Sequence, residues 1–254
     1  MGLERQIAIV IPALNEAHTI VDLAERALAY SRHVIVVDDG SSDGTAELLS
    51  ELPVTVLRHT STQGKGASLV TGFRAALKRE VWAVVTLDGD GQHRPEDLPK
   101  FLARAGQETG QENGKIIIGS RLADKAEFPL ERYRANRFAD FWISWASGHL
   151  IEDSQSGFRL YPRQVLESVR ASADRHHGFV FESEILINAA RKGYRCAAVS
   201  IPALYHGATR RKSHFRPVAD ILRIVRMVAG KLLSRGMYPQ GLYRVFRAWQ
   251  DKNP

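Results

Sequence analysis

Residues 81–93 read Val-Trp-Ala-Val-Val-Thr-Leu-Asp-Gly-Asp-Gly-Gln-His, a mainly apolar run that ends in two aspartates separated by a glycine. The run at 81–87 lacks a regular alternation of apolar and polar residues, which is typical of a strand buried on both faces. Residues 7–11 and 33–37 have the same character, and the second of these runs ends in Asp38-Asp39-Gly40. Strands of this kind form parallel sheets covered by helices, so the pattern predicts an α/β fold.

Helix-like segments separate these strands. Apolar residues recur at helical spacing after the first strand, at positions Ile20, Leu23, Ala24, Ala27 and Leu28. Gly64-Lys65-Gly66 opens another helix, and further strands are predicted at 54–57 and 115–118. In parallel sheets ligands bind beyond the carboxyl ends of the strands, which is where the Asp- and Gly-rich segments fall. We therefore expect the functional site at that edge.

The pair Asp88 and Asp90 can converge on one hard cation once the loop leaves strand geometry, and the glycines beside Asp90 permit that departure. A divalent cation held by few carboxylates keeps positions open for substrate phosphates, and it offsets the charge of a departing diphosphate. The alternative for the same residues is a solvated turn, in which Asp and Gly are common.

Two neighbouring loops border the same crevice. The carboxylates of residues 38–45 could accept hydrogen bonds from a ribose or a base, or could simply cap a helix and form a turn. Residues 12–16 end the first strand. Residues 64–66 lack the longer glycine spacing and the Lys-Ser/Thr pair of a P-loop, and no Gly-x-Gly-x-x-Gly follows the first strand, which excludes a dinucleotide-binding motif.

Five motifs occur in order: Ile-Pro-Ala-Leu-Asn-Glu (11–16), Val-Asp-Asp-Gly-Ser-Ser-Asp-Gly-Thr (37–45), Gly-Lys-Gly (64–66), Asp-Gly-Asp-Gly-Gln-His-Arg-Pro-Glu (88–96) and Gly-Ser-Arg (119–121). Together they resemble the family-2 inverting glycosyltransferases, which implies the GT-A fold, a Rossmann-like and mostly parallel sheet flanked by helices. Residues 153–159 and 178–184 resemble the acceptor-side loop and the next helix start of the branch that includes dolichyl- and polyprenyl-phosphate mannose synthases.

The resemblance implies a role for each matching residue. Asp90 would be the principal ligand of Mg²⁺ or Mn²⁺, with Asp88 and Gln92 beside it. The donor, a GDP- or UDP-hexose, would be held by Pro12, Leu14, Glu16, Asp38, Asp39, Lys65, Asp88, Gln92, Arg210 and Lys212. Arg121 and residues 210–213 would face the diphosphate or an anionic acceptor, because a guanidinium matches phosphate oxygens. The alternative for Arg121 is an ordinary surface ion pair.

Transfer to a sugar hydroxyl normally needs a carboxylate base, whereas a lipid phosphate is already anionic and needs none. The candidate bases are Asp153, Glu182 and Glu184. Glu182 and Glu184 are two residues apart, so at most one of them should point into the site if they lie on a helix. Asp153 could instead cap a turn or hold a cationic side chain. These residues leave the choice of acceptor open.

The tail carries the basic charge. Residues 204–254 hold 11 Lys and Arg against 2 Asp and Glu, whereas residues 1–203 hold 24 against 26. This distribution argues against nucleic acid as a partner and favours a localised anionic one. Residues 218–235 form a basic amphipathic helix, which either lies peripherally on the inner face of the membrane or packs on the catalytic domain. We expect a glycosyltransferase domain at 1–215 and a helical appendage at 216–254.

A lone cysteine, Cys196, excludes an internal disulfide and suits a cytoplasmic setting, and no apolar stretch reaches the roughly 20 residues that cross a bilayer. Three functions therefore compete. The first is a metal-dependent hexosyltransferase that acts on polyprenyl phosphate. The second keeps this donor and uses a saccharide or glycolipid hydroxyl as acceptor. The third is a non-catalytic protein that binds nucleotide sugars.

Overall fold

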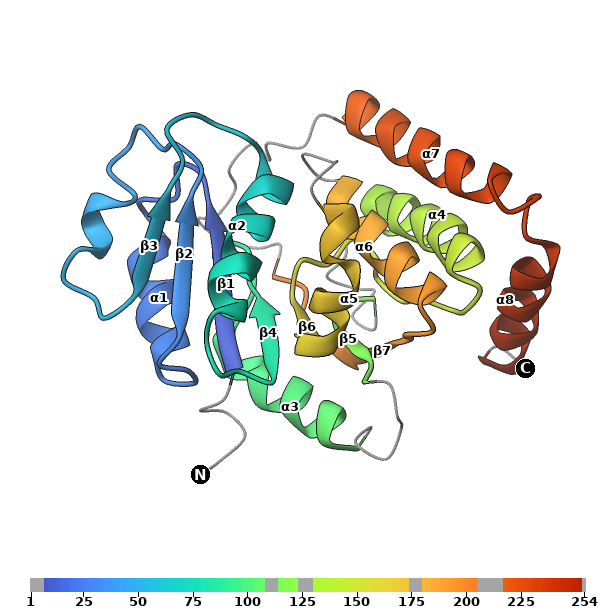
Figure 1. Ribbon diagram of the computed structural model, residues 1–254, viewed down its shortest axis with the longest axis horizontal. Helices are drawn as coiled ribbons and strands as arrows, with labels where there is room; N and C mark the ends of the chain where they lie inside the picture. The colour runs from blue at the N-terminus through green and yellow to red at the C-terminus, as the bar shows by residue number, and fades with distance from the viewer. Residues whose placement is uncertain (1–6, 108–113, 123–129, 174–179, 205–216, 253–254) are drawn as a thin grey trace.

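The computed structural model describes residues 7–107, 114–122, 130–173, 180–204 and 217–252. A seven-stranded sheet with the order β3-β2-β1-β4-β6-β5-β7 runs through its centre (Figure 1). The strands are β1 (Ile7–Ala13), β2 (Val34–Asp38), β3 (Thr55–Arg58), β4 (Ala83–Thr86), β5 (Ile116–Ser120), β6 (Arg159–Pro162) and β7 (Cys196–Ser200). All neighbours pair in parallel except β6, which runs antiparallel to β4 and β5. The predicted, mostly parallel α/β sheet is confirmed.

Helices cover both faces of this sheet. They are α1 (Ile20–Leu28), α2 (Lys65–Leu77), α3 (Leu98–Gln107), α4 (Leu130–Ser147), α5 (Arg163–Ala173), α6 (Val180–Arg191), α7 (Pro217–Leu233) and α8 (Pro239–Lys252), with short 3₁₀ turns at η2 (Glu47–Leu49) and η3 (Pro95–Asp97). Apolar residues of α1 and α3 share one core with the sheet, and those of α2, α4, α5 and α6 share the other. The sheet is therefore the middle layer of three.

The central strand shows how the sequence builds both cores. Along β1, Ile7, Ile9 and Ile11 enter the core beneath α1 and α3, whereas Ala8 and Val10 enter the opposite one. Successive strand side chains point to opposite faces, so an unbroken apolar run is what a doubly covered strand requires. Helix α2 lies so close to β1 that a Cβ added at Gly72 would come within 2.3 Å of the Val10 side chain.

The five strands predicted from apolar runs correspond to β1–β5. The residues around Cys196, 195–199, also have the composition of a strand, and they form most of β7. Strand β6 is not predicted by the sequence pattern. The strand begins at Arg159, within a segment that resembles an acceptor-side loop, and it contains no continuous apolar run that would predict a strand. Cys196 packs on the core, and burial raises the pKa of its thiol to about 12, which fits a core residue and not a nucleophile.

The basic tail packs on the rest of the chain. Ile224, Val228 and Leu232 of α7 are buried in the same core as α4 and α6. Lys231 Nζ lies 2.8 Å from Glu184 Oε1, and the Trp145 indole of α4 donates a 3.2 Å hydrogen bond to Tyr238 O ahead of α8. Of the two readings of the amphipathic helix, packing accounts for this part of its apolar face, and the division at residue 215 remains a prediction.

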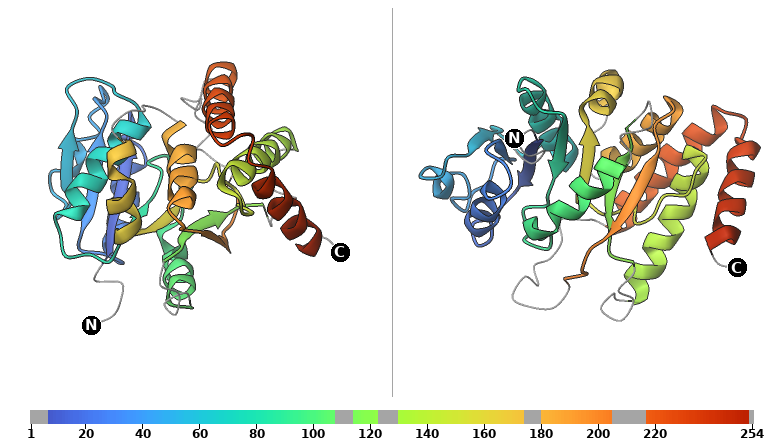
Figure 2. Two further views of the ribbon diagram at one scale, coloured as in Figure 1. Left: turned by 45° about the vertical axis from the view of Figure 1, so that its right-hand side comes forward. Right: turned by 90° about the horizontal axis from the view of Figure 1, so that it is seen from below.

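Helices α7 and α8 lie at the opposite end of the molecule from β3, as the views in Figure 1 and Figure 2 agree. None of the helices in the described ranges combines the length and apolar character that crossing a membrane requires.

Candidate active site

The loops that follow β1, β2 and β4 meet at one edge of the sheet, as parallel strand ends predict. The Glu16 amide donates a 2.9 Å hydrogen bond to Thr45 Oγ1, which joins the first loop to the second. The Thr19 hydroxyl donates a 2.6 Å hydrogen bond to Gly89 O, which joins the start of α1 to the loop after β4. These bonds bring the three predicted motifs together, and we call the place where the three loops meet the crevice.

Asp88 stands at the centre of this crevice, where Lys65 ties it to a second carboxylate. Lys65 Nζ lies 2.6 Å from Asp88 Oδ1 and 2.8 Å from Glu182 Oε2. Burial disfavours the Asp88 anion, but the charge of Lys65 and its hydrogen bond outweigh burial and hold the pKa of Asp88 well below its usual range. Burial likewise opposes the Lys65 cation, yet the two carboxylates raise its pKa above the ordinary value. The ammonium and the Asp88 carboxylate therefore both stay ionised.

Asp90 has the opposite electrostatic setting. Burial, and next the charge of Asp88, raise the pKa of Asp90 above its ordinary value. Its Oδ1 accepts a 3.0 Å hydrogen bond from the Gln92 amide, so the loop turns tightly around this carboxylate. Two half-buried carboxylates that repel each other are an arrangement that a divalent cation relieves.

Few side chains near Asp88 could act as metal ligands. Among the described ranges, no cluster of three or more His, Cys, Asp or Glu side chains forms a cage for a metal. Mg²⁺ suits such a site, because it commonly takes one or two carboxylates and completes its shell with water and substrate phosphates. The residues present therefore fit a cation bound together with its substrate.

The loop at 153–159 comes directly against Asp88. A Cβ added at Gly157 would lie 2.5 Å from Asp88 Oδ1, so a larger residue there would displace the Asp88 carboxylate. The Thr86 hydroxyl at the end of β4 donates a 2.6 Å hydrogen bond to Gly157 O, which holds the loop there. The segment that resembles an acceptor-side loop is thus a direct neighbour of the predicted metal site.

Arg121 and Asp153 bind each other. Arg121 donates from Nε to Asp153 Oδ2 and from Nη2 to Asp153 Oδ1, each at 2.8 Å, and its backbone amide donates to Oδ2 at 2.9 Å. Asp153 is fully buried and also accepts from Asn136 at 3.4 Å. Of the two readings of Asp153, the structure supports the one in which it holds a cationic side chain. The roles predicted for Asp153 as a base and for Arg121 towards phosphate stay predictions.

Asp140 of α4 anchors the same loop from behind. Its two carboxylate oxygens accept hydrogen bonds from the amides of Ser154 at 2.7 Å and Asp153 at 3.2 Å. Burial raises the pKa of Asp140 to about 6 despite the bonds from Ser154, and the charge of Asp153 acts in the same direction. The folded protein therefore keeps a proton on Asp140 at pH values where the unfolded chain has released it.

This linkage predicts a pH dependence of stability. Between pH 4 and 6 the folded state binds the extra proton, so the contribution of Asp140 to the free energy of unfolding should fall by about 2–3 kcal/mol as pH rises. Urea unfolding of the wild type and Asp140→Asn across this window measures the contribution as the difference between two curves. Parallel curves would show that Asp140 titrates normally.

The two glutamates of α6 point to different partners, as their spacing predicted. Glu182 reaches Lys65 and the crevice, whereas Glu184 lies 2.8 Å from Lys231 of α7. Only Glu182 is therefore placed where it could take part in chemistry. The catalytic role predicted for Glu184 gains no support from this placement.

Arg159 is an organising residue to which the sequence motifs assign no role. It is fully buried, and its guanidinium donates to the carbonyl oxygens of Ser154 at 2.7 Å, Ser156 at 2.7 Å and Glu182 at 2.6 Å. It thereby joins the 153–159 loop to the first turn of α6. The signal in the sequence was an arginine enclosed by apolar residues in Gly-Phe-Arg-Leu-Tyr, because such an arginine must satisfy its donors internally.

Some of the residues predicted to hold the donor already bind other residues of the protein. Asp39 accepts from the amides of Gln63 at 2.9 Å and Gly64 at 2.7 Å, and Asp38 lies 3.1 Å from Arg58 Nε. Pro12 is buried within β1, and Leu14 and Glu16 are partly exposed beyond its end. Contact of these five residues with a donor stays a prediction. Arg210 and Lys212 lie outside the described residues.

Comparison with known proteins agrees with this geometry. The sequence profile of glycosyl transferase family 2 matches residues 8–170. Polyprenol monophosphomannose synthase of Mycolicibacterium smegmatis is 31% identical over 204 residues, which cover 76% of this chain and 75% of that protein. UDP-N-acetylglucosamine–dolichyl-phosphate N-acetylglucosaminyltransferase of Methanococcus voltae is 28% identical over 223 residues, with coverage of 80% and 87%.

The fold has solved counterparts. Glucosyl-3-phosphoglycerate synthase of Mycobacterium tuberculosis, in a crystal structure with Mg²⁺ and UDP, superposes with a TM-score of 0.59 at 23% identity, covering 92% of this chain and 82% of that one. This similarity confirms the predicted GT-A fold. The profile match covers most of the chain, and the named relatives are enzymes, so the hypothesis of a non-catalytic binding protein loses its support. This chain belongs to glycosyl transferase family 2 and is a glycosyltransferase.

Proposed function

We propose that this enzyme transfers a hexose, with inversion, from a GDP- or UDP-sugar to a polyprenyl phosphate, and that the transfer depends on Mg²⁺ or Mn²⁺. The observation that carries the proposal is the meeting at Asp88 of three elements: the Asp88–Asp90 loop, the 153–159 loop and the first turn of α6. The residues that we assign to the donor and to the acceptor would thereby reach the same reacting centre.

Asp90 would be the main ligand of the cation, with Asp88 and Gln92 beside it. When bound, such an ion supplies positive charge to the diphosphate that leaves. The chain's own residues provide the surroundings. The cation of Lys65 adds a fixed positive charge beside the carboxylates, and the loops after β1 and β2 would enclose the nucleoside. Arg210 and Lys212 would complete the diphosphate contacts.

A phosphate acceptor fits the charges of the site. Its oxygen attacks the anomeric carbon, the bond from that carbon to the diphosphate breaks, and the nucleoside diphosphate departs with the electron pair. No proton has to be removed from the nucleophile, so a free carboxylate base is not required. This agrees with the bonding of Asp153, because both of its carboxylate oxygens accept hydrogen bonds from the guanidinium of Arg121. Two relatives are named for transfer to polyprenol or dolichyl phosphate.

One observation favours the second acceptor class, a saccharide or glycolipid hydroxyl. Glu182 points into the crevice, where its carboxylate could accept a proton once Lys65 moved. Under this alternative Glu182→Gln abolishes turnover on the hydroxyl acceptor. Under the lipid-phosphate proposal the same variant keeps measurable turnover. We place the enzyme in the cytoplasm, peripherally bound to the membrane that holds its acceptor.

Nucleotide binding provides the direct test of the donor site. GDP or UDP should raise the melting temperature only when Mg²⁺ or Mn²⁺ is present, because a ligand that binds the folded state stabilises it by mass action. At a hundredfold excess over the dissociation constant the stabilisation is about 2.7 kcal/mol, roughly 5–10 °C for a chain of this size. Asp90→Asn should lose the shift. The absence of any shift, for both nucleotides with both metals, would overturn the donor assignment.

A further inference from the structure

Helices α4 and α8 present a cluster of exposed aromatic side chains far from the crevice. Phe138 of α4 is 58% exposed, and Tyr243, Phe246 and Trp249 of α8 are 67%, 50% and 46% exposed. We call these four residues the aromatic face. A group of exposed aromatic side chains on two packed helices indicates a site of interaction, because single scattered apolar side chains are the ordinary case.

The aromatic face is held in place by rings packed beneath it. Phe141 lies between the two helices, with its ring centroid 6.1 Å from that of Phe246 and 5.6 Å from that of Trp142. Trp142 stacks on Trp145 at 5.3 Å, and Trp145 in turn binds the backbone ahead of α8. The exposed rings therefore stand on a packed support, so little further order has to be imposed on them when a partner binds.

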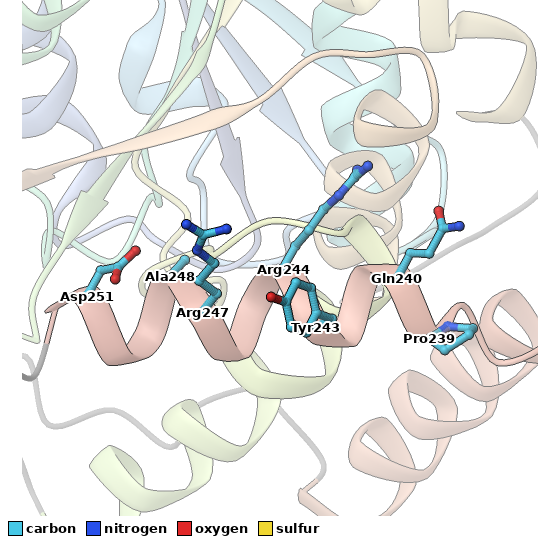
Figure 3. A pocket seen from close by; sticks show the side chains of 7 residues that line it. All are labelled: Pro239, Gln240, Tyr243, Arg244, Arg247, Ala248 and Asp251. Carbon is cyan, nitrogen blue, oxygen red and sulfur yellow. The ribbon is translucent and has the colours of Figure 1, made fainter.

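Arginines lie beside the rings on the same helix. Arg244 and Arg247 are exposed and line a groove of about 660 Å³ along α8, together with Tyr243 (Figure 3). Over residues 217–252 the sequence has seven Lys and Arg against two Asp and Glu. At helical spacing, Trp249, Phe246 and Tyr243 take one side of the exposed surface of α8, and Arg247 and Arg244 take the adjoining side.

We propose that the aromatic face, with Arg244 and Arg247, docks the enzyme on an anionic lipid surface. Aromatic rings with polar tips settle at the headgroup level, and arginines beside them are attracted to anionic headgroups. A second copy of this chain fits less well, because two faces with the same net positive charge repel each other. The proposal rests on the proposed function, since a polyprenyl phosphate acceptor is held in a membrane.

The structure thereby assigns docking to α4 and α8 in place of the apolar stripe of α7. Ile224, Val228 and Leu232 of that stripe are buried against α4 and α6, so they are unavailable to lipid while the protein is folded. Arg223 and Arg226 of α7 remain exposed and add to the net positive charge of the tail. Docking through α8 leaves the packing of α7 intact.

The test is sedimentation of the full chain with vesicles in the absence of substrates. Vesicles of phosphatidylcholine with about 30% phosphatidylglycerol should bind the wild type, and phosphatidylcholine alone should bind it about tenfold more weakly. The triple variant Tyr243→Ser/Phe246→Ser/Trp249→Ser and the double variant Arg244→Glu/Arg247→Glu should each lose at least about tenfold in binding to the anionic vesicles. Leu48→Ser is the matched control, since Leu48 is 49% exposed on η2 at the other end of the molecule and should leave binding unchanged.

Two further readouts separate the possible outcomes. Turnover on a short, water-soluble polyprenyl phosphate without vesicles should be the same in all these variants, which shows that they are folded. Equal vesicle binding by the wild type and the triple variant would overturn the docking proposal and leave the proposed function standing. A wild-type dimer that the triple variant converts to a monomer, without vesicle binding, would assign the face to a second copy. Vesicle binding with no turnover on any lipid phosphate would instead remove the proposed function.

Discussion

Asp90→Asn is expected to lower turnover by about a hundred- to a thousandfold, the loss typical when one group that stabilises transition-state charge is removed. The variant keeps the shape of the side chain and its bond with the Gln92 amide, but removes the negative charge that would bind the cation. Burial and the charge of Asp88 raise the pKa of Asp90 in spite of that hydrogen bond, so a bound cation would stabilise the ionised form of this carboxylate. The measurement is transfer of labelled sugar to a lipid phosphate across a range of Mg²⁺ and Mn²⁺ concentrations.

Asp97→Asn is the matched control for this loss. Asp97 is a buried carboxylate in the η3 turn a few residues further on, and it pairs with Lys100 Nζ at 2.6 Å. Its replacement should change turnover by less than threefold, because a partly exposed ion pair contributes little. If both variants kept nearly full activity, the Asp88–Asp90 loop would be a structural turn and the metal assignment would fail.

Arg159→Met is expected to give the largest loss of stability, about 3–5 kcal/mol in the free energy of unfolding. The substitution keeps much of the side-chain volume but leaves the carbonyls of Ser154, Ser156 and Glu182 without their buried donor. For a chain of this length such a loss lowers the melting temperature by roughly 10 °C or more. Circular dichroism during thermal and urea unfolding measures both quantities.

Arg163→Met separates the effect of burial from that of the hydrogen bonds themselves. Arg163 also donates to two carbonyls, those of Leu77 and Arg79, each at 2.8 Å, but its side chain is 36% exposed. Water can replace its bonds, so the expected loss is about 1 kcal/mol. Equal losses in the two variants would show that the buried position of Arg159 adds nothing to its effect.

Much of the sheet could be predicted because its buried strands are continuous apolar runs in the sequence. The apolar runs at 7–11, 33–37 and 81–87 leave little choice but a doubly covered sheet, and parallel strands place their following loops together. The divergence of Glu182 and Glu184 was also predictable, since residues two positions apart in an α-helix point in directions that differ by about 200°. The strand β6 was not predictable in this way, because its burial depends on Arg159 satisfying its donors within the fold.

The pairings at the crevice could not be derived from local sequence. Lys65 meets Asp88 and Glu182 across large separations along the chain, and Arg121 meets Asp153 in the same manner. Such contacts follow from the topology of the sheet and not from spacing within a motif. The tail posed the same difficulty, because an amphipathic helix shows that it has an apolar face without showing what covers that face.

The antiparallel strand β6 has a consequence for how this protein folds during its synthesis on the ribosome. Strands β1–β4 come from the first third of the chain, but the free edge of β4 is covered only when residues 159–162 add their hydrogen bonds. Until then the nascent chain carries an open strand edge and an unfilled apolar surface, both of which promote aggregation. The pairing of β4 with β6 joins residues more than seventy positions apart, which makes this step of folding slow. The strand that carries Arg159 thus also determines when the edge of β4 is protected from aggregation with other chains.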